Sequence, residues 1–216
     1  MRVLTALFLT ATLFAPSAAP AASETQDFAA IAWVPAPGAV SAAIEEHAQR
    51  VLQASDHGAR PFAIVDKRSA TMAVYHVDGA LAGVTPVLLG LTPGDLTLAG
   101  VGQRTQTGRL RVEDRTTPAG RFDSRPGRNL NGEAIVWIDY GAALAIHRLR
   151  RDASRETRML RMASSDPRDK RVSAGCVVVP EAFYDAVVHP LLGNGPGVVY
   201  VMPEAGSGSV AGHNPA

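Results

Sequence analysis

Short apolar runs separated by turn residues fill the chain between residues 62 and 202. Runs of this length, bounded by Gly, Pro, Asp or Ser, are typical of β-strands. Gly and Pro are frequent and aromatic residues make up only 6% of the chain, which fits many turns better than a helical bundle. We therefore predict a mainly β domain, a sandwich or barrel with a few short helices. The expected strands are Phe62 to Val65, Thr71 to Val77, Ala80 to Leu89, Ala134 to Ile138, Ala142 to Ile146, Val177 to Val179 and Val198 to Met202.

Two helices are expected beside these strands. The first follows Ser41, which can cap it, and residues 44–52 repeat apolar side chains at the spacing of one helix face. The second begins at Pro180, and Pro190 and Gly193 are expected to end it. No strand is followed by a glycine fingerprint and a helix, so a Rossmann fold is not indicated.

The N-terminus resembles a secretory signal. Arg2 precedes an apolar stretch from Val3 to Phe14, and small residues at positions 19–21 offer a cleavage site. The apolar stretch is shorter than the roughly 20 residues that span a bilayer. We therefore predict a signal peptide at residues 1–21 and a periplasmic mature protein with no stable membrane insertion after cleavage.

The rest of the chain divides into three expected parts. These are an N-terminal extension with one helix at residues 22–60, a main domain at 61–203 and a flexible tail at 204–216. Residues 90–133 within the main domain are rich in Gly, Pro and charges, and they are expected to be loops with short strands. The net charge of +1 gives no reason to expect nucleic acid as a partner.

Cys176 is the single cysteine of the sequence, which excludes an intrachain disulfide and a multi-cysteine zinc site. The histidines show no metal-ligand spacing, so neither a metal nor a cofactor is expected. Gly175 lets the backbone bend so that consecutive amides face one oxygen, the arrangement of an oxyanion hole. A thiol also needs a base, and His147 at the end of a predicted strand is the best candidate. With Ser173 to hold the loop or orient the imidazole, these residues predict a site for acyl transfer.

The pattern around these residues resembles the L,D-transpeptidase catalytic domain (YkuD-type), in which a histidine precedes Ser/Thr-x-Gly-Cys and a hydrophobic residue. Here the pattern is His147 followed by Ser173-Ala174-Gly175-Cys176-Val177, and Thr117-Pro118-Ala119-Gly120 is similar to the family's Thr-Pro-x-Gly segment. The resemblance covers residues 62–202. It implies a β-sandwich or barrel of that family over 61–203, with Cys176, His147, Ser173 and Gly175 as catalytic residues.

Three positions depart from the family pattern. Ala174 stands where the family often has His, and Arg148 stands where Gly often follows the upstream histidine. Val178 stands at the substrate-binding position that commonly carries Arg or Asn. The resemblance places substrate contacts at position 178, and Arg171 or Arg148 is expected to supply the missing polar group. Eight Arg and one Lys lie between residues 148 and 171, in what we interpret as a solvated loop or surface helix.

The resemblance also implies the reaction and the partners. The Cys176 thiolate would attack a peptidoglycan tetrapeptide stem, with the amides of Gly175 and Cys176 as oxyanion donors, and form a thioester. The acyl group would pass to an amine of a neighbouring stem or of an acceptor lipoprotein, whereas transfer to water would make the protein an L,D-carboxypeptidase. A catalytically weak cell-wall binding protein of the same fold and a redox-active exported thiol are the alternatives from other classes.

Overall fold

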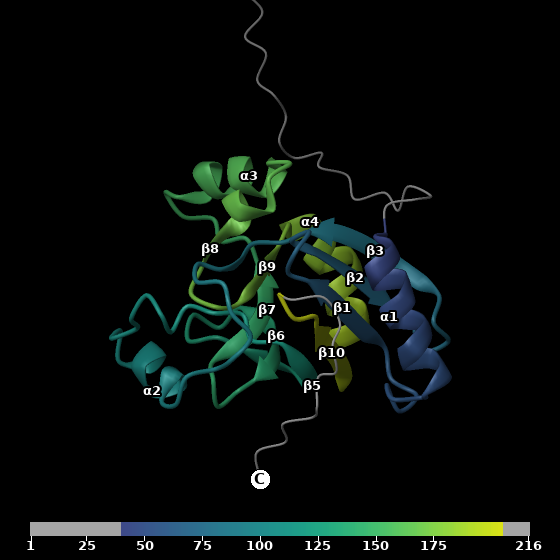
Figure 1. The fold of residues 1–216 in the computed structure, drawn as a ribbon. Coiled ribbons are helices and arrows are strands. Elements are labelled where there is room, and N and C mark those ends of the chain that lie inside the picture. Colours follow the sequence, from purple (N-terminus) through teal and green to yellow (C-terminus); the bar gives the residue numbers. More distant parts are fainter. Residues whose placement is uncertain (1–39, 205–216) are drawn as a thin grey trace, which may run out of the picture. The chain divides into compact units, whose positions relative to one another are not determined.

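The computed structural model describes residues 40–204, which are drawn in colour in Figure 1. The expected signal peptide, most of the extension before the first helix and the expected tail beyond residue 204 lie outside the described residues. The mainly β class expected from the short apolar runs is confirmed. The strands are β1 (Phe62–Asp66), β2 (Thr71–Tyr75), β3 (Leu81–Pro86), β4 (Leu89–Gly90), β5 (Gly120–Arg128), β6 (Ala134–Asp139), β7 (Leu144–Arg148), β8 (Arg171–Ser173), β9 (Val177–Val179) and β10 (Gly197–Val201).

The helices are short and lie between or beside the strands. In the described part of the chain, none of them is long and apolar enough to cross a membrane. They are α1 (Ala42–Gln53), α2 (Val101–Gln106), α3 (Arg155–Ala163), the 3-10 turn η2 (Pro167–Lys170), α4 (Glu181–Phe183), the π-helical η3 (Tyr184–Val188) and α5 (His189–Leu192).

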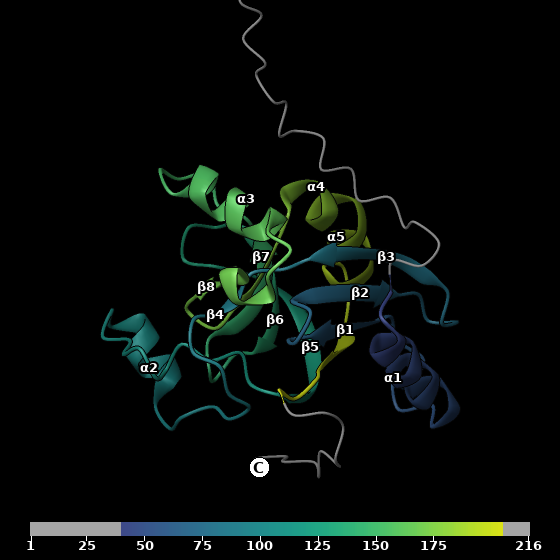
Figure 2. The same ribbon diagram turned by 45° about the horizontal axis from the view of Figure 1, so that its top comes forward.

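Eight strands form one curved sheet in the order β3-β2-β1-β10-β5-β6-β7-β9, and β4 and β8 form a separate parallel pair. The two edges of the large sheet meet where the chain leaves β3. There Leu88 and Val178 exchange two backbone hydrogen bonds of 2.9 Å each. The sheet is therefore a nearly closed barrel, with β7 and β9 beside the junction (Figure 1, Figure 2).

The inner face of the sheet packs on the helical segment α4–η3–α5, which Figure 2 shows against the strands. Alternate strand residues point to this face because successive side chains of a strand point in opposite directions. Val65, Val74, Val177 and Val199 all belong to this core and are completely buried. Phe183 fills it from the helical side and is also completely buried.

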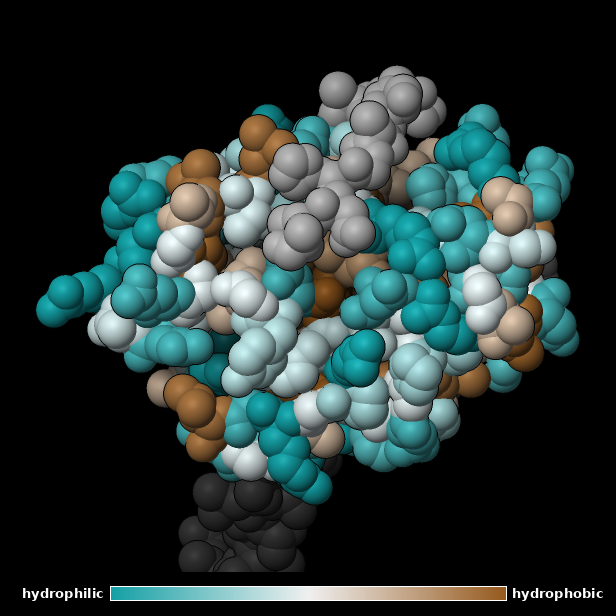
Figure 3. Space-filling model, turned by 90° about the horizontal axis from the view of Figure 1, so that it is seen from below, coloured by the Kyte–Doolittle hydropathy of each residue, from teal (hydrophilic) through white to brown (hydrophobic). Residues whose placement is uncertain are grey.

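The opposite face of β1, β2 and β10 packs on α1. Ser41 caps this helix as expected, since its side chain accepts a hydrogen bond of 3.3 Å from the Ile44 amide. Ile44, Phe62 and Tyr200 belong to the resulting second core. Figure 3 shows the surface of the molecule from below. There hydrophilic side chains surround scattered hydrophobic ones, so no broad apolar patch is visible on the surface that this figure shows.

Three differences from the expectation concern β5, the second helix and β7. Residues 120–128 were expected within a loop-rich segment and instead form β5, a long strand between β10 and β6. Pro190 does not end the second helix, because the preceding π-helical turn leaves the proline at the start of α5. The strand expected at residues 142–146 begins at Leu144, since Ala143 has a left-handed φ of 54° in the preceding turn.

Candidate active site

The two predicted reacting residues lie on adjoining parallel strands. β7 and β9 pair with His147 opposite Val178, and Cys176 immediately precedes β9. Residues two apart in a strand share a face, so Cys176, Val178 and His147 point to the same side of the sheet. The pairing of β7 with β9 therefore places Cys176 and His147 near one another on one face of the sheet.

The loop before Cys176 is held by the Ser173 hydroxyl. Ser173 Oγ donates to the Cys176 carbonyl at 2.7 Å and accepts from the Gly175 amide at 3.1 Å. Of the two roles predicted for Ser173, the structure shows the one that holds the loop. The same contact corrects one expectation, because the Gly175 amide is occupied by Ser173 and is not free to face an oxyanion.

Position 175 requires glycine because of its backbone conformation and because of the atoms close to it. Its φ of +126° lies in the region that L side chains rarely adopt. A Cβ on Gly175 would also lie 2.9 Å from the Thr116 carbonyl oxygen. The segment at residues 115–117 therefore passes directly against the cysteine loop, and glycine is the residue that permits this approach.

Thr117 connects that segment to the cysteine loop. Its Oγ1 donates to the Gly175 carbonyl at 2.7 Å and accepts from the Gly90 amide at 2.9 Å. The Thr117 side chain is completely buried, so both bonds are shielded from water. Behind it, the buried Lys67 ammonium donates to the Thr117 carbonyl at 3.0 Å and to the Asp95 carboxylate at 2.6 Å.

His147 is held in one tautomer. Its Nδ1 lies 2.8 Å from the Arg148 carbonyl oxygen, which can only accept a hydrogen bond. Nδ1 therefore carries the proton, and Nε2 keeps a lone pair that can accept one. Burial lowers the pKa of His147, the bond to the Arg148 carbonyl opposes this, and the charge of Arg150 lowers it further. The imidazole is accordingly a neutral base at neutral pH.

Cys176 as a residue is partly exposed, and its thiol is neutral at rest. Its Sγ donates to the Ala143 carbonyl at 3.5 Å. Burial raises the pKa of the Cys176 thiol, while the Ala145 amide and the charge of Arg150 lower it in part. Because the pKa of the thiol is raised and that of the imidazole is lowered, this site favours a neutral pair over a preformed thiolate–imidazolium pair.

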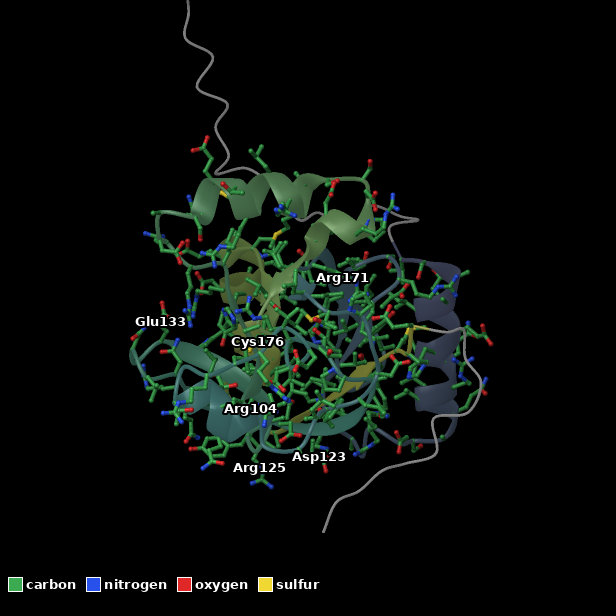
Figure 4. The ribbon with its side chains drawn as sticks, turned by 60° about the vertical axis from the view of Figure 1, so that its left-hand side comes forward. Arg104, Asp123, Arg125, Glu133, Arg171 and Cys176 are labelled. Atoms are coloured by element: carbon green, nitrogen blue, oxygen red, sulfur yellow. The ribbon has the colours of Figure 1, made fainter. Side chains whose placement is uncertain are left out.

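A small pocket opens beside the cysteine loop. Figure 4 shows Cys176 between α3 above it and Arg104 of α2 below it. The pocket wall formed by α2 is held by Asp114, which accepts hydrogen bonds from Arg104 at 2.7 Å and from Arg111 at 3.0 Å. The lining residues are Thr97, Val101, Asp114, Thr116, Pro118, Ala142, Ala143, Leu144, Ala174 and Gly175.

The three predicted substrate-binding residues contact other parts of the protein. The Arg148 guanidinium donates to Asp185 at 2.8 Å and lies 4.0 Å from the centroid of the Tyr184 ring, on the face opposite His147. Arg171 donates to both carboxylate oxygens of Glu204 at 2.8 Å. Val178 is 3% exposed and packs in a third small core with Leu88, Leu149 and Met162. Carboxylates therefore engage both arginines, and Val178 has no polar side-chain group to offer.

The site contains residues that sequence reasoning passed over. For Thr117, the available sequence signal is the Thr-Pro-x-Gly segment to which it belongs. Lys67 has no sequence signal, because its position depends on contacts between distant segments. Among residues 40–204, no group of three or more His, Cys, Asp or Glu side chains is arranged to hold a metal ion.

Comparison with known proteins finds similarity at the level of solved structures. No family model and no curated protein matches the chain. The helical cell shape determining protein Pgp2 of Campylobacter jejuni is 14% identical with a TM-score of 0.45, over 68% of this chain and 48% of Pgp2. The L,D-transpeptidase of Mycobacterium smegmatis is 16% identical with a TM-score of 0.33, over 66% of this chain and 58% of that enzyme.

The catalytic domain of the E. faecium L,D-transpeptidase is 18% identical with a TM-score of 0.33, over 65% of this chain and 95% of the domain. The chain spans about half the length of Pgp2 and of two other matched structures. Similarity at this level of identity concerns the fold. Most of the solved structures to which this chain is similar are L,D-transpeptidases.

Proposed function

We propose that this chain is a peptidoglycan L,D-transpeptidase, a cysteine acyltransferase whose nucleophile is Cys176. The observation that carries the proposal is the placement of Cys176 and His147 on one face of two paired strands. The His147 tautomer fits a general base, because Nε2 is left with its lone pair. The order of the Thr-Pro-x-Gly segment, the histidine and the Ser-x-Gly-Cys segment is the order of the family that the sequence resembles.

The proposed reaction begins with proton transfer from the Cys176 thiol to Nε2 of His147. The sulfur then attacks the carbonyl carbon between an L-centre and a D-amino acid, and the carbonyl oxygen takes the negative charge. The Cys176 amide remains as a donor for that oxygen, since Ser173 occupies the Gly175 amide. As the C–N bond breaks, the leaving amine receives the proton from His147. A thioester on Cys176 and a free D-amino acid result.

The acceptor of the acyl group completes the cycle. An amine, deprotonated by His147, attacks the thioester carbonyl, forms a new amide and releases the thiol. We propose the amine of a neighbouring stem peptide or of an acceptor lipoprotein as this nucleophile. Water in its place would form a carboxylate and make the protein an L,D-carboxypeptidase.

The proposed location is the periplasm, where stem peptides are accessible. Residues 1–21 carry the pattern of a cleavable signal, with a basic residue before an apolar stretch and small residues after it. N-terminal sequencing of the protein purified from a periplasmic fraction is expected to begin after Ala21. A protein retained in the cytoplasm with Met1 intact would contradict this part of the proposal.

A covalent adduct with a carbapenem tests the nucleophile. The β-lactam carbonyl is an acyl donor, so intact mass spectrometry is expected to show wild-type protein increased by the mass of one carbapenem. Cys176→Ala is expected to show no increase, and His147→Gln a much slower one. An adduct of unchanged yield in Cys176→Ala would remove Cys176 from the mechanism.

Val178 favours one second candidate, a cell-wall binding protein of the same fold with weak catalysis. Its apolar, buried side chain leaves position 178 without the polar group that the resemblance leads one to expect. Binding of a stem peptide that persists in Cys176→Ala, together with no product from the wild-type protein, would support this candidate over the enzyme.

A further inference from the structure

Lys67 is a charged residue with a completely buried side chain, which is rare for lysine unless its ammonium is paired. The Nζ atom donates to the Gly94 carbonyl at 2.5 Å, to the Asp95 carboxylate at 2.6 Å and to the Thr117 carbonyl at 3.0 Å. An ammonium has three protons, so these three bonds use all of its donors. Lys67 therefore ties two segments that are distant from each other in the sequence to the end of β1.

The same ammonium belongs to a cluster of four charges. The Glu204 carboxylate lies 3.5 Å from Nζ of Lys67, and both of its oxygens accept a hydrogen bond of 2.8 Å from Arg171. The backbone amide of Glu204 donates to the Asp95 carboxylate at 3.0 Å. Two cations and two carboxylates are thereby connected, and we call Lys67, Asp95, Arg171 and Glu204 the charge cluster.

The charge cluster supports both hydroxyl groups that hold the nucleophile loop. Thr117, whose carbonyl accepts from Lys67, donates through its Oγ1 to the Gly175 carbonyl at 2.7 Å. Arg171 begins β8 and Ser173 ends it, with the Ser173 Oγ 3.1 Å from the Gly175 amide. The two side chains that fix Gly175 are thus connected to the same buried charges.

We propose that Lys67 is a positioning residue for the nucleophile, a role that rests on the function proposed above. Apolar side chains of similar volume often give a fold as much stability as a buried ion pair, because burial removes the hydration of both charges. Charged hydrogen bonds are stronger than neutral ones, so they fix Thr117 in place. Thr117 fixes Gly175, and the Cys176 sulfur then meets the substrate carbonyl at one position. Lys67 acts through Thr117 and not by contact with the reacting atoms.

Hydrogen–deuterium exchange of the full chain, read at single amides by NMR, tests this positioning without any acyl transfer. Lys67→Met keeps a long side chain and removes the three donors. The Gly90 amide donates to Thr117 Oγ1, and the Gly175 amide donates to Ser173 Oγ. We expect both amides to exchange faster in Lys67→Met and the amides of α1 to exchange at the wild-type rate, because the loss of order is local.

Two further variants separate positioning from a general loss of stability. Arg121→Met is the matched control, since Arg121 pairs with Asp56 and Asp123 in an ion cluster beside α1. It is expected to leave exchange at the Gly90 and Gly175 amides unchanged. Asp95→Asn keeps the shape of the carboxylate and removes its charge, so it is expected to change these two amides as Lys67→Met does, but by less. It takes the place of Lys67→Met if that variant does not fold.

Carbapenem acylation then tests what the positioning does for the reaction. With every variant folded, the maximal acylation rate of Lys67→Met is expected to fall about tenfold or more, because small displacements of a reacting group cost that much. The carbapenem concentration that gives half of the maximal rate is expected to stay unchanged, and Arg121→Met is expected to react like wild type. A loss of stability alone would not produce this difference.

Two results would overturn the role of Lys67. One is unchanged exchange at the two glycine amides in both Lys67→Met and Asp95→Asn. The other is a maximal acylation rate of Lys67→Met equal to that of wild type. Absence of any adduct in wild type, together with the expected difference in exchange, would instead contradict the proposed function.

Discussion

At the scale of single residues, the neutral resting state of the Cys176–His147 pair sets the chemistry. Burial raises the pKa of the thiol and lowers the pKa of the imidazole, because it disfavours the charged form of each group. The thiol therefore holds its proton at neutral pH, and the imidazole is free to receive it. Proton transfer to His147 must then precede or accompany nucleophilic attack, in contrast to enzymes that hold a preformed thiolate.

The pH dependence of alkylation follows from these shifts. A thiol is deprotonated above its pKa, so a raised pKa moves the increase in iodoacetamide reactivity to higher pH. The rate is expected to keep rising beyond pH about 8.5, the ordinary value for a thiol. Carbapenem acylation uses neutral His147, whose pKa is lowered, so its rate is expected to be level from pH about 6.5 to 8. An alkylation rate already constant at pH 7 would show a preformed thiolate and contradict this account.

Thr117 is expected to hold the nucleophile loop through its hydroxyl. Thr117→Val keeps the shape of the side chain but leaves the Gly175 carbonyl and the Gly90 amide unpaired. Each buried unpaired group costs about 1–3 kcal/mol. We expect a lower free energy of unfolding in urea and a slower acylation of Cys176. Thr116→Val is the control, since the Thr116 hydroxyl makes only a 3.5 Å contact, and an equal effect of both variants would contradict the role of Thr117.

The sequence pattern indicates candidates for the reacting residues more clearly than candidates for substrate binding. Cys176, His147 and Ser173 could be chosen because their chemistry and order are visible in the sequence. Arg148 and Arg171 could not be excluded in the same way, because Asp185 and Glu204 approach them only in the folded chain. The use of an arginine depends on its partners, and partners distant in sequence are not visible in a local pattern.

At the scale of elements, α2 forms one wall of the pocket and depends on a single carboxylate. The side chain of Asp114 is completely buried and accepts bonds from Arg104 and Arg111. The hydrogen bond from Arg104, with that from Arg111, holds the pKa of Asp114 far below its ordinary value. The carboxylate therefore stabilises this segment fully above pH about 4, and that stabilisation is lost only as the pH falls through the lower folded pKa.

Asp114→Asn is expected to loosen α2. The amide has one oxygen in place of two and no charge, so the two guanidinium groups lose most of their partner. Hydrogen–deuterium exchange is expected to become faster in residues 101–107 and to stay unchanged in α1. Glu113→Gln is the control, because Glu113 is exposed and pairs only with Arg111 at 3.3 Å. Unchanged exchange in Asp114→Asn would contradict the role assigned to this carboxylate.

β5 is a strand that the sequence pattern did not predict. Its residues include Gly120, Pro126 and Gly127, and such residues are usually signs of a loop. It is a strand because it pairs with β10 on one side and β6 on the other. Strands with a clear apolar run, such as β9 at Val177–Val179, were predicted with their observed bounds. Hydrogen bonding to two neighbouring strands thus overrides the loop preference of the local sequence in β5.

At the scale of the whole molecule, the core inside the curved sheet holds the strands around the helical segment α4–η3–α5. Phe183 is completely buried there. Phe183→Ala is expected to lower the free energy of unfolding by about 3–5 kcal/mol, measured by urea denaturation. Leu130→Ala, at a side chain that is 98% exposed, is expected to change it by less than about 0.5 kcal/mol. A loss below about 1 kcal/mol in Phe183→Ala would contradict this packing.

The barrel junction explains why the candidate site is located at β7 and β9. The bridge between Leu88 and Val178 closes the sheet beside these strands, and the segment carrying Thr117 crosses next to it. Thr117 and Gly175, which are 58 positions apart in sequence, are thereby held together beside Cys176. The mainly β class could be expected from strand-length runs, but this junction depends on sheet closure, for which the sequence offers no local signal.

The most direct test of the whole account is mass spectrometry of purified disaccharide-tetrapeptide incubated with the protein, with and without an added amine acceptor. We expect release of the terminal D-amino acid and a new amide to the acceptor from wild type, and neither product from Cys176→Ala. Recovery of unchanged tetrapeptide from wild type, or the same products from Cys176→Ala, would contradict the assignment of Cys176 as the acyl-transferring nucleophile.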